Sequence, residues 1–150
     1  MMLLAALALA MLHAIWTDWR ERVIENWLNL GIAVAAPLYW WATGLNLWPD
    51  VAFQLGLALV TLSIFTALFA FGAMGGGDVK LLASLALWFP PIPFINLLVI
   101  MSIIGGVLTL VMYIRHKLSN APEKLEVPYG IAIAAACLWT MYERNFNHFG

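Results

Sequence analysis

Long apolar runs separated by short polar breaks dominate the sequence. The breaks contain residues that end helices, above all the glycines between positions 72 and 77 and the prolines between 90 and 93. A membrane-spanning helix needs about 20 mostly apolar residues, so the pattern predicts an all-α membrane protein, a polytopic bundle of about six transmembrane helices. The expected helices cover residues 2–17, 27–42, 51–71, 79–89, 94–114 and 127–142.

The fourth expected helix is too short to cross a bilayer by itself. Residues 79–89 rise only about 16 Å as an α-helix, against a hydrocarbon core of about 30 Å. We therefore expect this helix either to be extended through residues 72–78 or to begin partway into the membrane.

Composition supports a membrane protein and leaves little room for anything else. Of the 150 residues, 64% are apolar and 10% are charged, whereas a soluble domain has roughly 45–50% and about 25%. Six helices use most of the chain, so residues 1–150 are expected to form a single transmembrane domain with no separate soluble domain. The net charge of −1 provides no basic surface for nucleic acid, which is not expected as a partner.

The sequence offers no pattern for a metal or cysteine site. Cys137 is the single cysteine and lies in an apolar run, and the three histidines are scattered at positions 13, 116 and 148. We therefore expect no metal and no cofactor.

The positions of the basic residues predict the orientation. Six of the seven Lys and Arg residues fall in the first, third and fifth breaks of an alternating six-helix path: Arg20, Arg22, Lys80, Arg115, Lys117 and Lys124. Retained cytoplasmic loops are enriched in Lys and Arg, so these breaks are expected to face the cytoplasm and both termini to lie outside it. Tryptophans near the expected helix ends are interpreted as interfacial anchors.

Asp78 is the most informative acidic residue. It follows Gly75, Gly76 and Gly77 and opens an apolar helix, and the glycines would allow a sharp turn, positive φ angles or close packing. An ionisable group at membrane depth normally faces a protein interior or a water-filled cavity, which indicates a function. The alternative is that Asp78 is only the N-cap of its helix, and Lys80 is explained as a cation that reaches the interface.

Asp18 ends the first expected helix on the same side of the membrane as Asp78. A helix C-terminus disfavours negative charge unless a nearby arginine or a hydrogen bond offsets it. Two carboxyl groups in close proximity cannot easily both ionise, and such a pair sharing one proton is the arrangement of aspartic proteases. One member takes a proton from water while the other donates a hydrogen bond to the scissile carbonyl.

Three separated segments resemble the type IV prepilin peptidase family. Gly75-Gly76-Gly77-Asp78 fits the Gly-x-Gly-Asp motif of intramembrane aspartyl proteases, and residues 75–83 look like the corresponding region of prepilin peptidases. Residues 18–28 are similar to the first motif of that family, and residues 127–132 resemble its Pro-Tyr-Gly segment before the last helix. The short length resembles the members associated with Flp/Tad-type pili.

The resemblance implies both an activity and a site. Asp18 and Asp78 would be the catalytic pair, and Gly75 and Gly77 would shape the segment that carries Asp78. The reaction would be removal of the leader peptide from prepilin or pseudopilin substrates, which have a short basic leader before an apolar helix. The expected location is the inner (cytoplasmic) membrane, with the lipid bilayer as the other partner and an oligomeric state that the sequence does not indicate.

Two departures from the family pattern and two alternatives accompany this hypothesis. Glu25 stands where the family usually has proline, and it could either perturb the aspartate pair or lie in solvent near Arg22. The cysteine-containing domain linked to methyltransferase activity in larger relatives is absent from this sequence, so methyltransferase activity is not expected.

The alternatives are a presenilin-type Gly-x-Gly-Asp protease, whose Tyr-Asp and Pro-Ala-Leu signatures are missing, and a small non-enzymatic membrane protein that uses carboxylates to handle protons or cations.

Overall fold

The computed structural model describes residues 2–119 and 127–147, and every regular element in them is a helix. The six α-helices are α1 (Met2–Glu21), α2 (Asn26–Thr43), α3 (Ala52–Ala70), α4 (Gly76–Ala86), α5 (Pro91–Ser119) and α6 (Tyr129–Asn147), and a short π-helical segment, η1 (Leu47–Val51), leads into α3. The predicted all-helical fold is confirmed.

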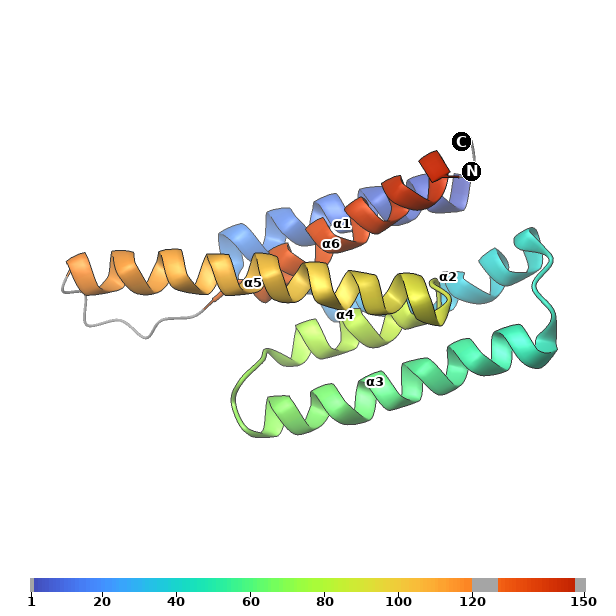
Figure 1. Ribbon diagram of the computed structural model, residues 1–150, viewed down its shortest axis with the longest axis horizontal. Helices are drawn as coiled ribbons and strands as arrows, with labels where there is room; N and C mark the ends of the chain where they lie inside the picture. Colours follow the sequence, from blue (N-terminus) through green and yellow to red (C-terminus); the bar gives the residue numbers. More distant parts are fainter. Residues whose placement is uncertain (1, 120–126, 148–150) are drawn as a thin grey trace.

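The short helix α4 is enclosed by the longer ones. It packs against α2, α3, α5 and α6, while α1 packs against α2 and α6. Figure 1 shows the helices running along the long axis of the molecule, with α1 beside α6 on one side and α3 beside α4 on the other. The end of α1, the start of α4 and the start of α6 are therefore brought to the same part of the bundle.

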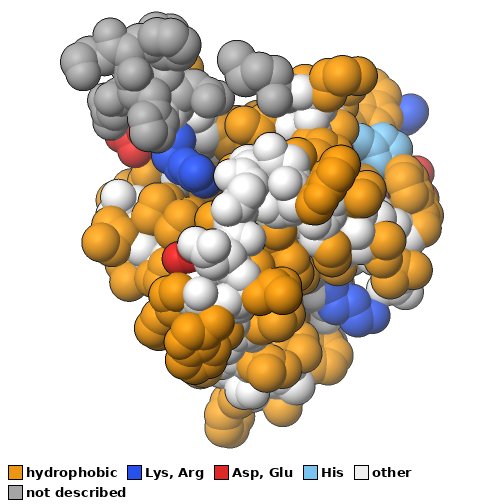
Figure 2. Space-filling view, turned by 90° about the vertical axis from the view of Figure 1, so that its right-hand side faces the viewer, with side chains coloured by type: hydrophobic (Ala, Val, Ile, Leu, Met, Phe, Trp, Pro, Cys, Tyr) orange, Lys and Arg blue, Asp and Glu red, His pale blue; other side chains and the backbone are white. Residues whose placement is uncertain are grey.

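Within the residues that the structure describes, three segments are long and apolar enough to cross a membrane. They are Met2–Glu21, Leu47–Ala70 and Pro91–Leu118. Large apolar side chains on their surfaces are exposed, for example Leu59 in α3 and Ile103 in α5, and Figure 2 shows hydrophobic side chains over most of the face that it presents. Such a surface fits contact with lipid.

Several helix ends differ from the sequence prediction. α4 begins at Gly76 rather than Val79, so two of the glycines lie in its first turn. α5 begins at Pro91 rather than Phe94, because the first turn of a helix tolerates proline, whose missing N–H would have no partner there. α5 also continues through Arg115 and Lys117, whereas Glu123, Lys124, Glu126 and His148 lie outside the described residues.

A buried tryptophan attaches the C-terminal end of α4 to α2. The Trp88 side chain is 2% exposed, its Nε1 donates a hydrogen bond to the carbonyl oxygen of Ile32 at 2.9 Å, and its ring stacks on Tyr39 at 4.9 Å between centroids. The interpretation of the tryptophans as interfacial anchors is wrong for Trp88, although Trp16, Trp19, Trp27, Trp41, Trp48 and Trp139 are exposed. The position of α4 is thereby fixed at the end opposite Asp78.

Candidate active site

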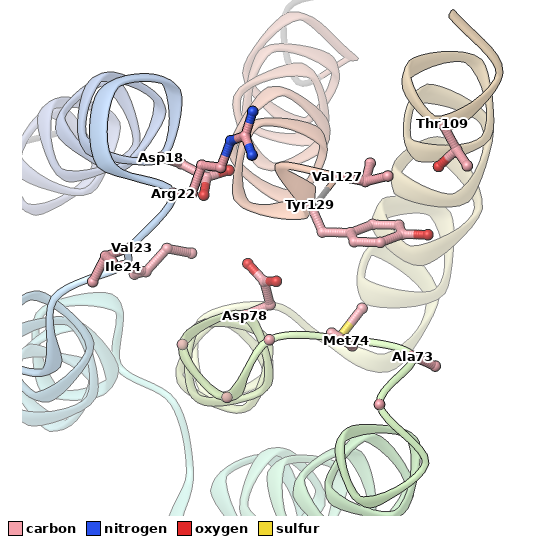
Figure 3. A pocket seen from close by; sticks show the side chains of 14 residues that line it. Asp18, Arg22, Val23, Ile24, Ala73, Met74, Asp78, Thr109, Val127 and Tyr129 are labelled. Carbon is pink, nitrogen blue, oxygen red and sulfur yellow. The ribbon is translucent and has the colours of Figure 1, made fainter. Parts of the chain in front are cut away.

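Asp18 and Asp78 line the same cavity. This cavity has a volume of about 640 Å³. It is bordered by the end of α1, by residues 72–78, and by the start of α6 together with the residues that precede α6. Figure 3 shows the two carboxyl groups pointing into this space from α1 and α4. Asp18 is 4% exposed and Asp78 is 7% exposed, and the negative charge of Asp18 acts on Asp78. Because ionising both groups is unfavourable at this proximity, the pair is suited to sharing one proton.

Asp18 is held by the first turn of α6. The backbone N–H of Ile131 donates a hydrogen bond to Asp18 Oδ2 at 3.0 Å, and the backbone of Gly130 also bonds to this carboxyl group. The positive charge of Arg22 acts on Asp18 as well. Partial positive charge at the start of α6 therefore compensates the unfavourable position of Asp18 near the end of α1.

Arg22 adopts an unusual backbone conformation next to Asp18. Its φ angle is 53°, in the left-handed region, and its N–H donates to the carbonyl oxygen of Asp18 at 3.1 Å. Only a few per cent of non-glycine residues adopt positive φ, and such residues cluster at functional sites. This conformation ends α1 and directs the chain into residues 23–25, so that Arg22 and Ile24 both line the cavity.

Asp78 is the third residue of α4 and not its N-cap. The N-cap is Gly75, so the suggestion that Asp78 only caps its helix is wrong in its geometry. The Asp78 carboxyl group does form a hydrogen bond with the backbone of Gly75, which is the contact that an acidic third residue makes in a capping box. The same side chain therefore stabilises the start of α4 and faces the cavity.

The three glycines before Asp78 serve close packing rather than an unusual backbone conformation. None of them has positive φ, whereas Gly72, which ends α3, has a φ of 73°. A Cβ atom at Gly77 would lie 3.1 Å from both Cβ and the carbonyl oxygen of Ile24, and one at Gly75 would lie 3.0 Å from Asp78 Oδ2. At Gly76 the nearest atom would be in the Phe69 ring at 3.4 Å, an ordinary contact. Gly75 and Gly77 are therefore closer to neighbouring atoms than Gly76 is.

Glu25 lies outside the cavity. It is the N-cap of α2 and its Oε2 is 3.3 Å from His13 Nε2, both side chains being about two-fifths exposed (39% and 42%). The expectation that Glu25 lies in solvent is correct in part, because its side chain is partly exposed and forms an ion pair with His13 in α1. Nothing in this arrangement links Glu25 to the carboxyl pair.

Lys80 also lies outside the cavity, on another side of α4. Its Nζ donates a hydrogen bond to Asn26 Oδ1 at 2.8 Å, and Asn29 Nδ2 donates to the carbonyl oxygen of Gly77 at 3.2 Å. These contacts attach the first turn of α4 to the start of α2 and so help to position Asp78.

Sequence reasoning did not assign roles to several residues that form the site. Tyr129 and Gly130 at the start of α6, and Thr109 in α5, border the cavity or touch its carboxyl groups. The Tyr129 ring packs closely on α5, since a Cβ atom at Gly105 would lie 3.1 Å from it. The resemblance of residues 127–132 to a family segment was the available signal, but the sequence did not show that this segment contacts Asp18.

The arrangement supplies two buried carboxyl groups beside a space large enough for a bound segment, since ligand sites commonly occupy about 300–1,000 Å³. Among the side chains in residues 2–119 and 127–147, no group of three or more His, Cys, Asp or Glu residues could hold a metal ion. The chemistry that these residues themselves can provide is general acid–base catalysis by a carboxyl pair.

Comparison with known proteins identifies the class and then the family. The model of the type IV leader peptidase family matches residues 5–110, and this family implies a membrane-bound, aspartic-type peptidase. The chain belongs to this family, so the resemblance found in the sequence is confirmed at the family level. The family implies prepilin substrates. Comparison with curated proteins and with solved structures found no match.

Proposed function

We propose that this protein is a prepilin leader peptidase of the short Flp/Tad type, an intramembrane aspartyl endopeptidase that removes the leader of prepilin-like substrates at the cytoplasmic membrane boundary. The observation that carries the proposal is that Asp18 in α1 and Asp78 in α4 line one cavity and are both buried, at 4% and 7% exposed. Family membership supports the same reaction.

In the proposed reaction, the pair carries one proton between its two carboxyl groups. The ionised member takes a proton from a water molecule, the protonated member donates a hydrogen bond to the scissile carbonyl, and the water attacks to give a tetrahedral intermediate. Proton transfer to the amine then releases the leader. Neither carboxyl group forms a covalent bond to the substrate in this scheme.

The proposed topology is a single domain with six helices in the inner membrane and both termini outside the cytoplasm. α4 has eleven residues and would begin partway into the membrane. The end of α1, the start of α4 and the end of α5 lie toward one end of the molecule in Figure 1, and the start of α1 and the end of α6 lie toward the other. The first end carries Arg20, Arg22, Lys80, Arg115 and Lys117, which favours a cytoplasmic location for it. A substrate helix could then remain in lipid while its polar leader reaches the cavity.

The decisive experiment is cleavage of a coexpressed prepilin by variants of each aspartate. General acid–base catalysis contributes about 10²–10⁴-fold to a rate, so Asp18→Asn and Asp78→Asn should each reduce cleavage by at least about 10²-fold while the protein still enters the membrane. Asp50→Asn is the matched control, because Asp50 bonds to Asn46 before α3 and does not line the cavity. Cleavage at the wild-type rate by either of the first two variants would refute the paired mechanism.

Reporter fusions test the topology separately. A reporter within residues 18–26 should give a cytoplasmic signal and one within residues 43–50 should not. The inverted result would place the cavity on the wrong side for a cytoplasmic leader. Ion flux through proteoliposomes without prepilin cleavage would favour the non-enzymatic alternative.

A further inference from the structure

Gly130 is the closest point of contact between α6 and the Asp18 carboxyl group. A Cβ atom at this position would lie 2.8 Å from Asp18 Oδ2, 2.9 Å from Asp18 Cγ and 2.7 Å from Ile24 Cδ1. Real Cβ atoms essentially never come this close to another heavy atom. Any side chain at residue 130 would therefore displace Asp18, Ile24 or the start of α6.

The close approach of Gly130 to Asp18 allows backbone groups of α6 to form hydrogen bonds with the Asp18 carboxyl group. With Gly130 in place, the backbone N–H of Ile131 reaches Asp18 Oδ2 at 3.0 Å, and Gly130 contributes a second backbone bond. Hydrogen bonds to an ionised group are stronger than those between neutral groups and fix its direction. These bonds hold the carboxyl group in the orientation in which it shares the cavity with Asp78.

Ile24 connects this contact to the other aspartate. Its side chain is 6% exposed, and it lies against Gly130 through Cδ1 and against Gly77, the residue before Asp78, through Cβ. The two glycines thus allow one isoleucine to fit between α4 and α6. Ile24 therefore contacts the segments that position both aspartates.

We propose that Gly130 is a positioning residue for the peptidase reaction, because its lack of a side chain lets the first turn of α6 hold the Asp18 carboxyl group in register with Asp78. This inference rests on the proposed function of the aspartate pair. It assigns to the start of α6 a role in catalysis without contact with the substrate.

The test compares Gly130→Ala with Gly106→Ala in the full-length protein, with a purified prepilin as substrate in detergent. Gly106 lies on α5, and a Cβ atom there would meet nothing within 4 Å, so it controls for a glycine-to-alanine change in a helix. Because small displacements of catalytic groups lower turnover more than binding, Gly130→Ala should lower kcat by more than about tenfold and change KM by less than about threefold. Gly106→Ala should change neither.

A second substitution separates positioning of Asp18 from packing on Ile24. Ile24→Val removes Cδ1, the atom nearest to a new methyl group at residue 130, but leaves the 2.8 Å conflict with Asp18. The double variant Gly130→Ala with Ile24→Val should therefore remain as slow as Gly130→Ala. Recovery of kcat to that of Ile24→Val alone would mean that Gly130 acts only through packing, and it would overturn the inference.

Unfolding provides a readout that does not depend on activity. Asp18→Asn should shift the thermal unfolding midpoint by different amounts in the wild-type and Gly130→Ala backgrounds, by about 2 °C or more, because the bonds from α6 exist in only one of them. Equal shifts in both backgrounds would overturn the inference, as would a Gly130→Ala variant that cleaves like Gly106→Ala. A wild-type protein that does not cleave prepilin would instead overturn the proposed function, and the role of Gly130 with it.

Discussion

Alanine substitution of the glycines before Asp78 should have opposite effects at adjacent positions. At Gly77 the added methyl group would lie 3.1 Å from Cβ and from the carbonyl oxygen of Ile24, so the first turn of α4 or residues 23–25 must move by a few tenths of an ångström. At Gly76 the methyl group would meet the edge of the Phe69 ring at 3.4 Å, which requires no movement. The pair is a matched comparison within one helical turn.

The expected magnitudes follow from these contacts. Overpacking costs about 1–3 kcal/mol, while replacing a helical glycine by alanine gains about 0.5–1 kcal/mol, so Gly77→Ala should be destabilised by about 0–2.5 kcal/mol. A misplacement of about 1 Å costs roughly 10²-fold in rate, so a smaller displacement of Asp78 should lower kcat by several-fold to about tenfold. Gly76→Ala should be as stable as the wild type or more so, with an unchanged rate.

The assay is prepilin cleavage by purified variants together with thermal unfolding in the same detergent. Both variants must be compared at equal amounts of folded protein, so that a loss of rate is not a loss of enzyme. The reasoning is refuted if Gly76→Ala is as slow as Gly77→Ala, or if Gly77→Ala cleaves at the wild-type rate.

Two further substitutions test features away from the cavity. The Glu25→Pro variant should still cleave prepilin and should unfold at the same temperature as the wild type or slightly higher. The φ of Glu25 is −68°, close to the value fixed by proline, and its exposed pair with His13 contributes at most about 1 kcal/mol. A large loss of activity would show that Glu25 acts on the aspartates. Trp88→Phe should lower the free energy of unfolding by about 1–3 kcal/mol, because it removes the hydrogen bond to Ile32 and leaves space in the core. Trp41→Phe should have little effect, because Trp41 is 86% exposed. Similar unfolding midpoints for the two variants would contradict this account of the core.

The sequence was sufficient to predict where helices occur and which aspartates come together. Apolar runs and helix-ending residues are local signals, and Asp18 and Asp78 were assigned to one side of the membrane by counting alternating helices. The predicted start of α5 was wrong because Pro91 and Pro93 occupy its first turn, where a proline is tolerated and gives the same sequence signal as a break.

The packing contacts around the two aspartates could not be predicted from the sequence. Glu25 pairs with His13 from the preceding helix, a contact that the spacing of Glu25 from Arg22 did not indicate. The packing role of Gly77 depends on Ile24, and that of Gly130 depends on both Ile24 and Asp18. Such roles arise from the approach of three chain segments, which no local pattern specifies.

The shortness of α4 has a consequence for how the protein is made. Eleven residues that include Asp78 and Lys80 form a poor independent unit for insertion, since each of these charges opposes entry of an isolated helix into the bilayer. α4 follows the strongly apolar α3 and packs closely along it, so we expect the two to enter the membrane as one hairpin. The helix that carries Asp78 would then depend on its predecessor during synthesis.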